Sequence, residues 1–447
     1  MGAQVRRAKA MAMAMAMSLT QLLCWGQAKP TAAQVEWQQM EMNMFCHFGP
    51  NTFTGNEWGD GQEDATVFNP TQLDCRQWVR TAKAAGFKGI IITAKHHDGF
   101  CLWPSQQSTH TVRESGFGRD VLAELSQACR EEGLKFGVYV SPWDRNHPTY
   151  GTPEYNQVFV NTMQEVHTQY GDVFEQWFDG ACGEGPNGKK QVYDWDAFRS
   201  AVLEQHPRCV IFSDYGPGCR WVGNEEGRAG ETCWSPINYT QAQFDGTEKA
   251  SQEMLNTGHR GGQYWIPAET DVSIRPGWFW RPSEHPKSLQ ELLRIYYTSV
   301  GRNSLLLLNV PPDNRGLIDR EDSIRLMEFR AALNSIFSND LAQHVVSMKS
   351  KGGLATYTMD EPVRFNRVLL QEDIADGQHV AGFELGVMVA GEHRIIATGT
   401  TIGYKRILLV PQQEQVEAVT LRITDSEGRP TISRIALYQD DIYDAER

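Results

Sequence analysis

The 447-residue sequence lacks a long cluster of lysine and arginine, and its formal net charge is −13. Phosphate backbones are bound by clustered cations, so this charge pattern argues against a nucleic-acid partner. The sequence also lacks C-x-x-C motifs and cysteine–histidine pairs at zinc-ligand spacing. Internal repeats are absent, and no segment after the N-terminus has the roughly 20 apolar residues of a transmembrane helix. We therefore expect a globular protein without a zinc-finger or membrane-spanning part.

The N-terminus has the order of a processing signal: a basic start, an apolar stretch and a small-x-small end. These segments are Arg6 to Lys9, Ala10 to Trp25, and Gly26 to Ala28. We predict a signal peptide over residues 1–28 and a secreted or periplasmic protein. Lipid anchoring at Cys24 is the alternative, but the preceding Leu23 stands where lipoprotein signals have a small residue. The other cysteines are scattered, and we expect buried free thiols because a large core needs no disulfides.

From Met42 to about Pro312, short apolar runs alternate with helical patterns. The runs are MNMFCHFG, GIIITAKHHDG, KFGVYVSP, FEQWFDG, CVIFSDYG, ETCW, YWIPAETD and SLLLLNVPP. Helices are predicted at Gln72–Ala85, Arg119–Glu132, Pro153–Tyr170 and Asp319–Ser335. Alternating strands and helices indicate parallel strands with crossover helices, and about eight repeats over this length fit a (β/α)₈-like TIM barrel. We predict an α/β fold whose catalytic barrel spans residues 29–340.

The pattern changes after about His344, where no long helical pattern remains. Six strand-like runs are separated by glycine, proline and aspartate turns. They are Arg364–Leu370, His379–Leu385, His393–Thr398, Lys405–Leu409, Ala418–Thr424 and Thr431–Tyr438. This pattern is typical of an antiparallel β-sandwich, which we predict for residues 344–447.

Asp179 ends the aromatic run EQWFDG, at the point where a barrel strand reaches its mouth. A carboxylate there can attack the anomeric carbon of a sugar. The alternative is an aspartate that caps a helix or stabilises a loop. The following loop, Gly183 to Lys189, has the glycine and lysine spacing of a phosphate-binding loop. However, Lys190 stands where Mg²⁺ binding needs serine or threonine, so no nucleotide is implied.

Three histidines also follow predicted strands: His47 in CHFGP, and the adjacent His96 and His97 in KHHDGF. Adjacent strand residues point to opposite faces, which makes joint metal capture awkward. Neutral imidazoles are good partners for hydroxyl groups, so we favour sugar recognition. A metal-dependent hydrolase that uses these histidines is the rival hypothesis, and satisfied core histidines are the plain alternative.

The glycine-rich segment RWVGNEEGRAGETCW carries Glu225, Glu226 and Glu231. A glycosidase needs a second carboxyl group that donates a proton to the leaving oxygen. A glutamate on this loop can approach the glycosidic bond from the leaving-group side. The alternative for each of the three is a solvated surface charge.

Several motifs together resemble glycoside hydrolase family 29, the retaining α-L-fucosidases. They are HFGP, NEWGDG, KHHDGFCLWPS, VYVSPWDRN, WFDGACGEG, RWVGNEEGRAGE and ETDVSIRPGWFW, in this order over residues 38–315. The tail resembles, more weakly, the galactose-binding-like β-sandwich often appended to these enzymes. The resemblance implies a retaining exo-α-L-fucosidase that acts on a fucosylated oligosaccharide or glycoconjugate by double displacement, with no metal or cofactor. The rival from another class is a fucose-binding protein that has lost catalysis.

The resemblance also assigns residues. It implies that Asp179 is the nucleophile and Glu225 the acid/base, with Glu226, Glu231 and Glu269 as alternatives for the second role. The substrate-binding residues that it implies are His47, Glu57, Trp58, His96, His97, Tyr139, Trp278 and Trp280. The segment around Glu225 resembles the branch of the family that cleaves α-1,3 and α-1,4 fucosyl linkages.

Overall fold

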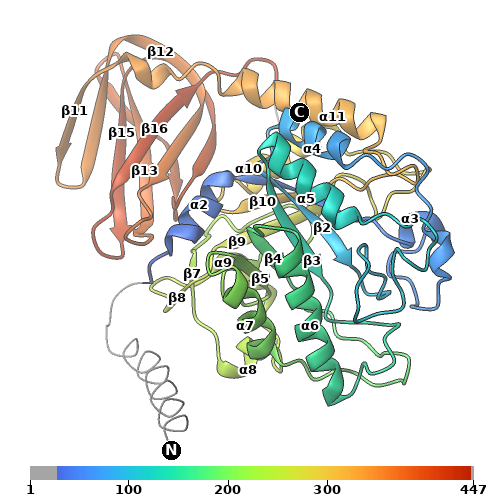
Figure 1. The fold of residues 1–447 in the computed structure, drawn as a ribbon. Coiled ribbons are helices and arrows are strands. Elements are labelled where there is room, and N and C mark those ends of the chain that lie inside the picture. The colour runs from blue at the N-terminus through green and yellow to red at the C-terminus, as the bar shows by residue number, and fades with distance from the viewer. Residues whose placement is uncertain (1–27, 444–447) are drawn as a thin grey trace, which may run out of the picture.

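The computed structural model describes residues 28–443. Nearly all of the predicted signal peptide, with Cys24, lies outside the described residues. The described chain forms a barrel of strands and helices followed by a sheet of long strands (Figure 1). Within residues 28–443, no helix is long and apolar enough to cross a membrane.

Eight parallel strands close into a barrel in the order β1-β10-β9-β6-β5-β4-β3-β2. They are β1 Met42–Cys46, β2 Gly89–Lys95, β3 Lys135–Val140, β4 Glu175–Trp177, β5 Val210–Ser213, β6 Cys219–Trp221, β9 Ala268–Ser273 and β10 Leu305–Asn309. Apolar runs such as that of β2 are buried along their whole length, as expected of parallel strands covered on both faces. The predicted TIM barrel is confirmed.

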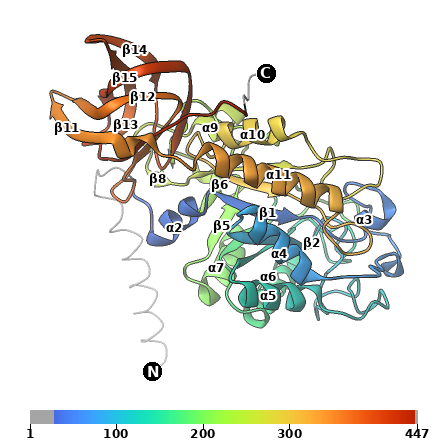
Figure 2. The ribbon, with the colours of Figure 1, turned by 90° about the horizontal axis from the view of Figure 1, so that it is seen from above.

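Helices surround the barrel (Figure 2). They are α4 Cys75–Ala85, α5 Val121–Glu132, α6 Pro153–Gln169, α7 Trp195–Gln205, α10 Leu289–Thr298 and α11 Arg320–Ile336. Asp74, Asp120 and Asp194 begin α4, α5 and α7 by accepting hydrogen bonds from backbone N–H groups of the first turn. Gly86 and Gly133 end α4 and α5 in the left-handed conformation that favours glycine. The helices predicted from the sequence are confirmed, with boundaries that differ by a few residues.

Shorter elements complete the barrel. They are α2 Ala32–Met40, α3 Asn51–Thr54, the 3₁₀ turn Ala65–Val67, β7 Pro236–Ile237, α8 Gln241–Phe244, α9 Gln252–Thr257 and β8 Tyr264–Trp265. Helix α2 closes the amino end of the barrel, because Trp37 packs with the interior side chains there. The Trp37 indole donates to Glu175, the first residue of β4, at 2.7 Å.

The sixth barrel strand differs from the prediction. ETCW was predicted to form it, but residues 231–234 lie in a loop and the strand is Cys219–Trp221. Only residues 214–218 separate β5 from β6, whereas parallel strands usually need a crossover of a dozen or more residues. Gly216 permits this short return because it has a φ of +91°. The run YWIPAETD also divides, into β8 outside the barrel and β9 within it.

The C-terminal part forms one six-stranded antiparallel sheet, in the order β11-β12-β15-β13-β14, with β16 also paired to β12. Its strands, which follow the 3₁₀ turn Leu341–His344, are β11 Val345–Lys351, β12 Leu354–Glu372, β13 Val380–Val389, β14 Glu392–Gly399, β15 Arg406–Ser426 and β16 Ile432–Tyr438. The amino half of β12 pairs with β11 and its carboxyl half with β16. Register shifts between the halves let β12 and β15 pass from one layer to the other. The predicted sandwich is confirmed as a folded-over sheet with a core of its own.

Two details of the sandwich prediction were wrong. The runs Lys405–Leu409 and Ala418–Thr424 belong to the single strand β15, because the polar segment between them continues as strand instead of turning. Strand β11 was missed, because most of its side chains are exposed and show no apolar pattern.

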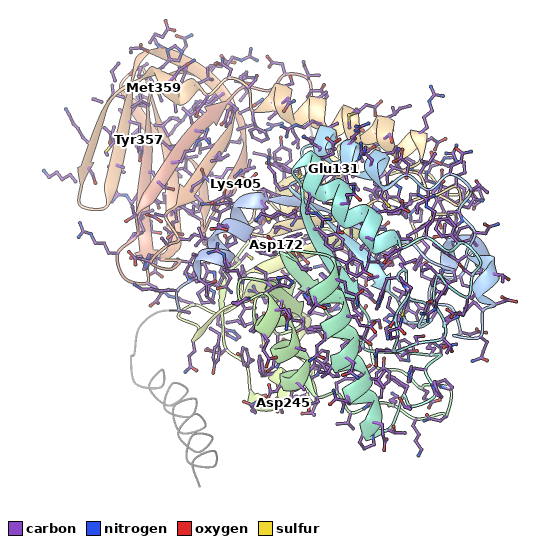
Figure 3. The ribbon with its side chains drawn as sticks, in the orientation of Figure 1. Glu131, Asp172, Asp245, Tyr357, Met359 and Lys405 are labelled. Atoms are coloured by element: carbon purple, nitrogen blue, oxygen red, sulfur yellow. The ribbon has the colours of Figure 1, made fainter. Side chains whose placement is uncertain are left out.

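The sandwich lies against the barrel beside α2 and α11 (Figures 1 and 2). Lys405 lies at this junction, whereas Tyr357 and Met359 lie on β12 within the sandwich (Figure 3). The Lys405 ammonium contacts the Glu41 carboxylate at the end of α2. The eight cysteines of the described residues are free, and seven are buried, as expected from the sequence.

Candidate functional site

Asp179 lies two residues beyond β4, at the carboxyl end of the barrel. The Tyr139 hydroxyl donates to its Oδ2 at 3.0 Å, and the backbone N–H of Ala181 donates to its Oδ1 at 2.8 Å. His97 Nε2 lies 3.6 Å from Oδ2. The side chain remains 27% exposed. Asp179 is therefore a carboxylate fixed by donors on one side and open to a ligand on the other.

The histidines predicted to bind substrate gather beside Asp179. The ring centroid of His96 lies 5.6 Å from that of His47 and 4.3 Å from that of His97, and its ring stacks on Tyr139. Burial lowers the pKa of all three histidines, that of His47 to about 3. The site therefore presents neutral imidazoles near neutral pH.

Neighbouring groups define which ring nitrogens are available. The Asn309 amide nitrogen donates to Ser273 and to the Trp278 carbonyl, so its oxygen accepts from His47 Nδ1 at 2.9 Å. This leaves His47 Nε2 as an acceptor. His97 Nδ1 lies 2.7 Å from the Ser141 hydroxyl, which itself donates to a carbonyl, so His97 Nε2 is likewise an acceptor.

His96 Nδ1 is buried and has no hydrogen-bond partner among residues 28–443. A buried polar atom without a partner costs free energy, unless a ligand supplies the missing bond. The three rings thus offer hydrogen-bonding nitrogens to hydroxyl groups beside the Asp179 carboxylate.

Aromatic rings form the walls of the site. The Trp278 ring lies 5.0 Å from the His47 ring, and the half-exposed Trp58 lies 5.9 Å from His97. The Glu57 carboxylate already has partners in the protein. It accepts from the Trp278 backbone N–H and pairs with Arg281 at 2.6 Å. Glu57 therefore holds the segment that carries Trp278.

Trp280 is not brought to the histidines. Its indole donates to Asp319 at 3.2 Å, and its ring faces the guanidinium of Arg275. Phe279 occupies the wall instead, with its ring 5.1 Å from that of His96. The family resemblance implied Trp278 and Trp280, but this segment bends, and the adjacent residues 278 and 279 line the site. No pattern in the sequence distinguished Phe279.

The four glutamates considered for the second carboxyl role lie in different surroundings. Glu226 is exposed and pairs with Arg228, and Glu231 is exposed and pairs with Arg302. Glu269 is buried inside the barrel, where it accepts from the Trp177 indole at 2.7 Å. Only Glu225, of these four, accepts a hydrogen bond from the wall residue Trp278, at 3.3 Å.

The electrostatics of Glu225 suit an acid. Glu225 is also an exposed residue, but desolvation by the residues around it raises the pKa of its carboxyl group, and the negative charges of Asp179 and Glu57 raise it further. Asp271, within β9, accepts from the Trp221 indole at 2.9 Å. Burial, followed by the charge of Glu225, raises the pKa of Asp271 well above its usual value. Asp271 is thus a buried neighbour of Glu225 that no motif in the sequence singled out.

Glu175, Cys219 and Glu269 form the group of potential metal ligands that the described residues contain, with ligand atoms within 4.8 Å of one another. Burial raises the pKa of both carboxyl groups, that of Glu175 to about 7, and also raises the pKa of the Cys219 thiol. Metal ligation needs a thiolate, whereas this environment favours the neutral thiol. Each carboxyl group accepts from an indole, Glu175 from Trp37 and Glu269 from Trp177, so the protein itself supplies a donor to each.

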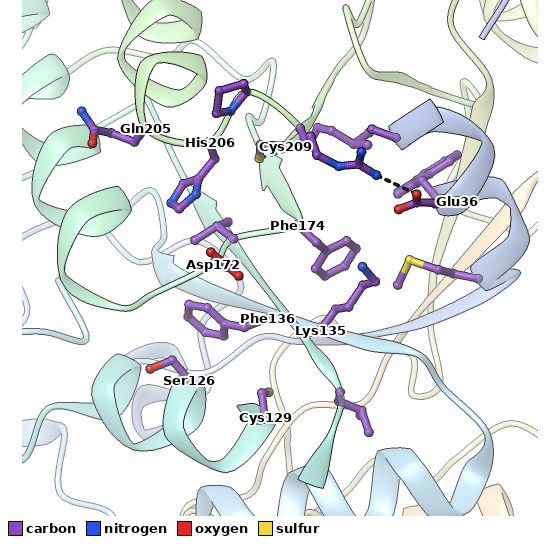
Figure 4. A pocket seen from close by; sticks show the side chains of 18 of the residues that line it. Glu36, Ser126, Cys129, Lys135, Phe136, Asp172, Phe174, Gln205, His206 and Cys209 are labelled. Carbon is purple, nitrogen blue, oxygen red and sulfur yellow. Dashed lines mark hydrogen bonds and ion pairs between the residues drawn. The ribbon is translucent and has the colours of Figure 1, made fainter. Parts of the chain in front are cut away.

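The opposite end of the barrel has a separate cavity of about 510 Å³. Phe136, Phe174 and Lys135 line it, and Glu36 pairs with Arg208 at its edge (Figure 4). None of the predicted site residues lies there, so the candidate site is confined to the carboxyl end.

Comparison with known proteins gives one family. The family model for α-L-fucosidase matches residues 22–335. The chain is 44% identical to α-L-fucosidase 1 of Arabidopsis thaliana over 449 aligned positions, which cover 92% of this chain and 87% of the plant protein. Its fold is similar to that of a glycoside hydrolase 29 family member from an unknown rumen bacterium, with a TM-score of 0.87, 40% identity, and coverage of 93% and 78% of the two chains.

A second solved structure contains a ligand. The Ruminococcus gnavus glycoside hydrolase 29 fucosidase in complex with fucose is 30% identical to this chain, with a TM-score of 0.83. The likeness covers 93% of this chain and 96% of the bacterial one. It therefore includes both the barrel and the sandwich.

The first prediction concerns the support of the histidines. Lys95, which precedes His96, donates to Asp144 at 2.8 Å, and both side chains are buried. Lys95→Met should lower the free energy of unfolding by about 3–5 kcal/mol, because it leaves a buried carboxylate without its cation. The double variant with Lys95→Met and Asp144→Asn should lose less free energy of unfolding than Lys95→Met alone. Urea unfolding measures both, and a single variant as stable as the wild type would contradict this role.

Proposed function

Because the chain belongs to the α-L-fucosidase family, glycoside hydrolase family 29, and is thus a glycoside hydrolase, we propose that it removes terminal α-L-fucosyl residues with retention of configuration. The observation that carries this proposal is the Asp179 carboxylate, fixed by Tyr139 and Ala181 and open toward a pocket of neutral histidines. The substrate is a fucosylated oligosaccharide or glycoconjugate.

In the proposed reaction, an Asp179 oxygen attacks the anomeric carbon as the bond to the leaving oxygen breaks. Glu225 gives its proton to that oxygen, which leaves as a hydroxyl group. Water then attacks the same carbon, Glu225 takes its proton, and the bond to Asp179 breaks. Two displacements restore the original configuration. The raised pKa of Glu225 supports this order, since the residue must start protonated.

The histidines and aromatic rings would select the sugar. His47 Nε2 and His97 Nε2 can accept from sugar hydroxyls, and the open nitrogen of His96 can complete the set. Fucose has a methyl group where most hexoses have a hydroxymethyl group. Burial of that methyl against an aromatic wall contributes about 1 kcal/mol, by the value of one buried CH₂.

A glycan-binding protein without catalysis is the alternative function. Such a protein would need the histidines and the aromatic walls but neither carboxyl group. Both carboxyl groups are present at the mouth of the barrel: Asp179 with its donors, and Glu225 beside Trp278. Their presence favours a catalytic function over simple binding.

We also propose export from the cytoplasm, on the basis of the basic and apolar pattern in residues 1–28. A signal peptidase would cut after the small-x-small end.

The second prediction tests the nucleophile. Asp179→Ala should abolish nearly all turnover while leaving the fold intact, because the covalent intermediate cannot form. Added azide should restore part of the activity and give a fucosyl azide of opposite anomeric configuration. Asp196→Ala, at an exposed aspartate on α7, is the matched control and should keep wild-type activity. Near-normal turnover by a folded Asp179→Ala protein would rule out the mechanism and favour the binding function.

The third prediction tests the acid. Glu225→Gln should lower kcat/KM on a fucosylated trisaccharide by about 10²–10⁴-fold, the usual contribution of general acid catalysis. The loss should be smaller on an aryl fucoside with an acidic phenol, which leaves without full protonation. Wild-type activity on the trisaccharide should fall as the pH rises through the pKa of Glu225, and the variant should lack this fall.

The neighbouring Glu226→Ala is the control for Glu225→Gln, because Glu226 is exposed and pairs only with Arg228 at the surface. Equal losses on both substrates for Glu225→Gln would move the acid role to Glu226, Glu231 or Glu269.

The fourth prediction concerns linkage. We propose a preference for α-1,3 and α-1,4 fucosyl linkages on branched N-acetylglucosamine, on the basis of the GNEEG segment around Glu225. Such substrates carry a neighbouring galactose, and binding energy from that sugar can be realised in the transition state. The wild type should therefore cleave a Lewis-type trisaccharide faster than an α-1,2-fucosyl lactose or an aryl fucoside. Steady-state kinetics on the three substrates decide this, and a preference for the α-1,2 linkage would refute it.

A further inference from the structure

The segment that carries Glu225 runs from Val222 to Ser235, between β6 and β7, and we name it the acid loop. It contains no helix or strand, so its conformation depends on hydrogen bonds from side chains to its backbone. Several of these contacts come from the C-terminal sandwich, which is distant in sequence. The inference below rests on the proposed role of Glu225 as the acid.

The sandwich binds the carboxyl half of the acid loop directly. The Arg406 guanidinium donates to the Glu231 carbonyl at 2.7 Å. The Thr401 hydroxyl oxygen accepts from the backbone N–H of Cys233 at 3.0 Å. The Gln378 side chain accepts from Ser235 N–H at 2.7 Å and donates to the Cys233 carbonyl at 3.0 Å. Arg406, Thr401 and Gln378 are all buried.

Two arginines contact the acid loop, Arg302 from the barrel and Arg406 from the sandwich, and both need acceptors from the loop backbone. Arg302, from the barrel, donates to the Ala229 carbonyl at 3.1 Å and pairs with Glu231 at 3.3 Å. Burial lowers the pKa of Arg406, and the neighbouring charge of Arg302 lowers it further. Arg302 and Arg406 thus bring two positive charges close together. The acid loop offers both of them oxygen acceptors, namely the carbonyls of Ala229 and Glu231 and the carboxylate of Glu231.

Contacts within the barrel connect this anchored part to Glu225. The Asn256 amide donates to the carbonyls of Val222 and Arg228, and the Asn224 amide donates to the Arg228 carbonyl at 2.8 Å. The backbone from residue 222 to 229 is thus tied in a short arch, and Glu225 lies within it. A displacement of the anchored half moves the end of this arch.

We propose that the sandwich is a positioning element for the acid. Thr401 and Arg406 hold the acid loop in the position that directs Glu225 toward the leaving oxygen. Asp179 and the histidines do not depend on these contacts, because the barrel holds them. Loss of these contacts therefore affects proton donation and spares fucose binding and nucleophilic attack.

The test uses the full-length protein and two variants that each remove one contact. Thr401→Val keeps the shape of the side chain and removes the acceptor for Cys233 N–H. Arg406→Gln removes the donor that reaches the Glu231 carbonyl. Each should lower kcat/KM on the Lewis-type trisaccharide by about 10-fold or more, since small misplacements of catalytic groups are costly. Activity on the aryl fucoside with an acidic phenol should stay within about 2-fold of wild type, because that phenol leaves without full protonation.

Three controls separate positioning from damage to the fold. Thr401→Ser retains the hydroxyl and should restore trisaccharide activity. Thr431→Val, at an exposed threonine elsewhere on the sandwich, should behave as wild type. The inhibition constant for free fucose should be unchanged in Thr401→Val and Arg406→Gln.

Equal losses on the two substrates, or no loss on the trisaccharide, would overturn the positioning role. If Glu225→Gln itself shows no difference between the substrates, the proposed acid is wrong. If Glu225→Gln discriminates between them but Thr401→Val and Arg406→Gln do not, only the role of the sandwich fails.

Discussion

The barrel interior contains two carboxyl groups that water does not reach, those of Glu175 and Glu269. Burial of an ionised group without a partner is too costly, so each carboxyl group must be neutral or hydrogen-bonded. The indole of Trp177 donates to Glu269, its ring stacks on Tyr139, and Tyr139 donates to Asp179. The position of the proposed nucleophile thus depends on a buried polar group at the centre of the barrel.

Several carboxyl groups lie near one another at the mouth, and their mutual repulsion shifts their pKa values. Asp179 has donors on both oxygens. Desolvation raises the pKa values of Glu225, Asp271 and Asp214, the residue that follows β5, and the charge of Asp179 adds to each rise. Burial and mutual repulsion thus favour the protonated form of these three groups more than that of an isolated carboxyl group. The neutral histidines belong to the same arrangement, since charged imidazoles would pair with Asp179 and block it.

Much of this could be predicted from the sequence, because parallel barrels collect strand ends at one mouth. That rule brought Asp179, His47, His96 and His97 together correctly. It could not identify β6, because a five-residue return replaces the expected helix. Nor could it identify Phe279, because residues 274–279 form bends after β9 and follow no regular pattern. The contacts of the acid loop with the sandwich were also beyond reach, because they join residues that no local pattern connects.

Helix α2 has a consequence for the order of folding. Trp37 donates to a residue 138 positions downstream, and Glu41 contacts Lys405, 364 positions downstream. During synthesis Trp37 must wait until Glu175 has emerged, and Glu41 must wait until almost the whole chain has emerged before it meets Lys405. The barrel itself cannot close until β10 has emerged to pair with β1, so α2 can complete its contacts only late in synthesis.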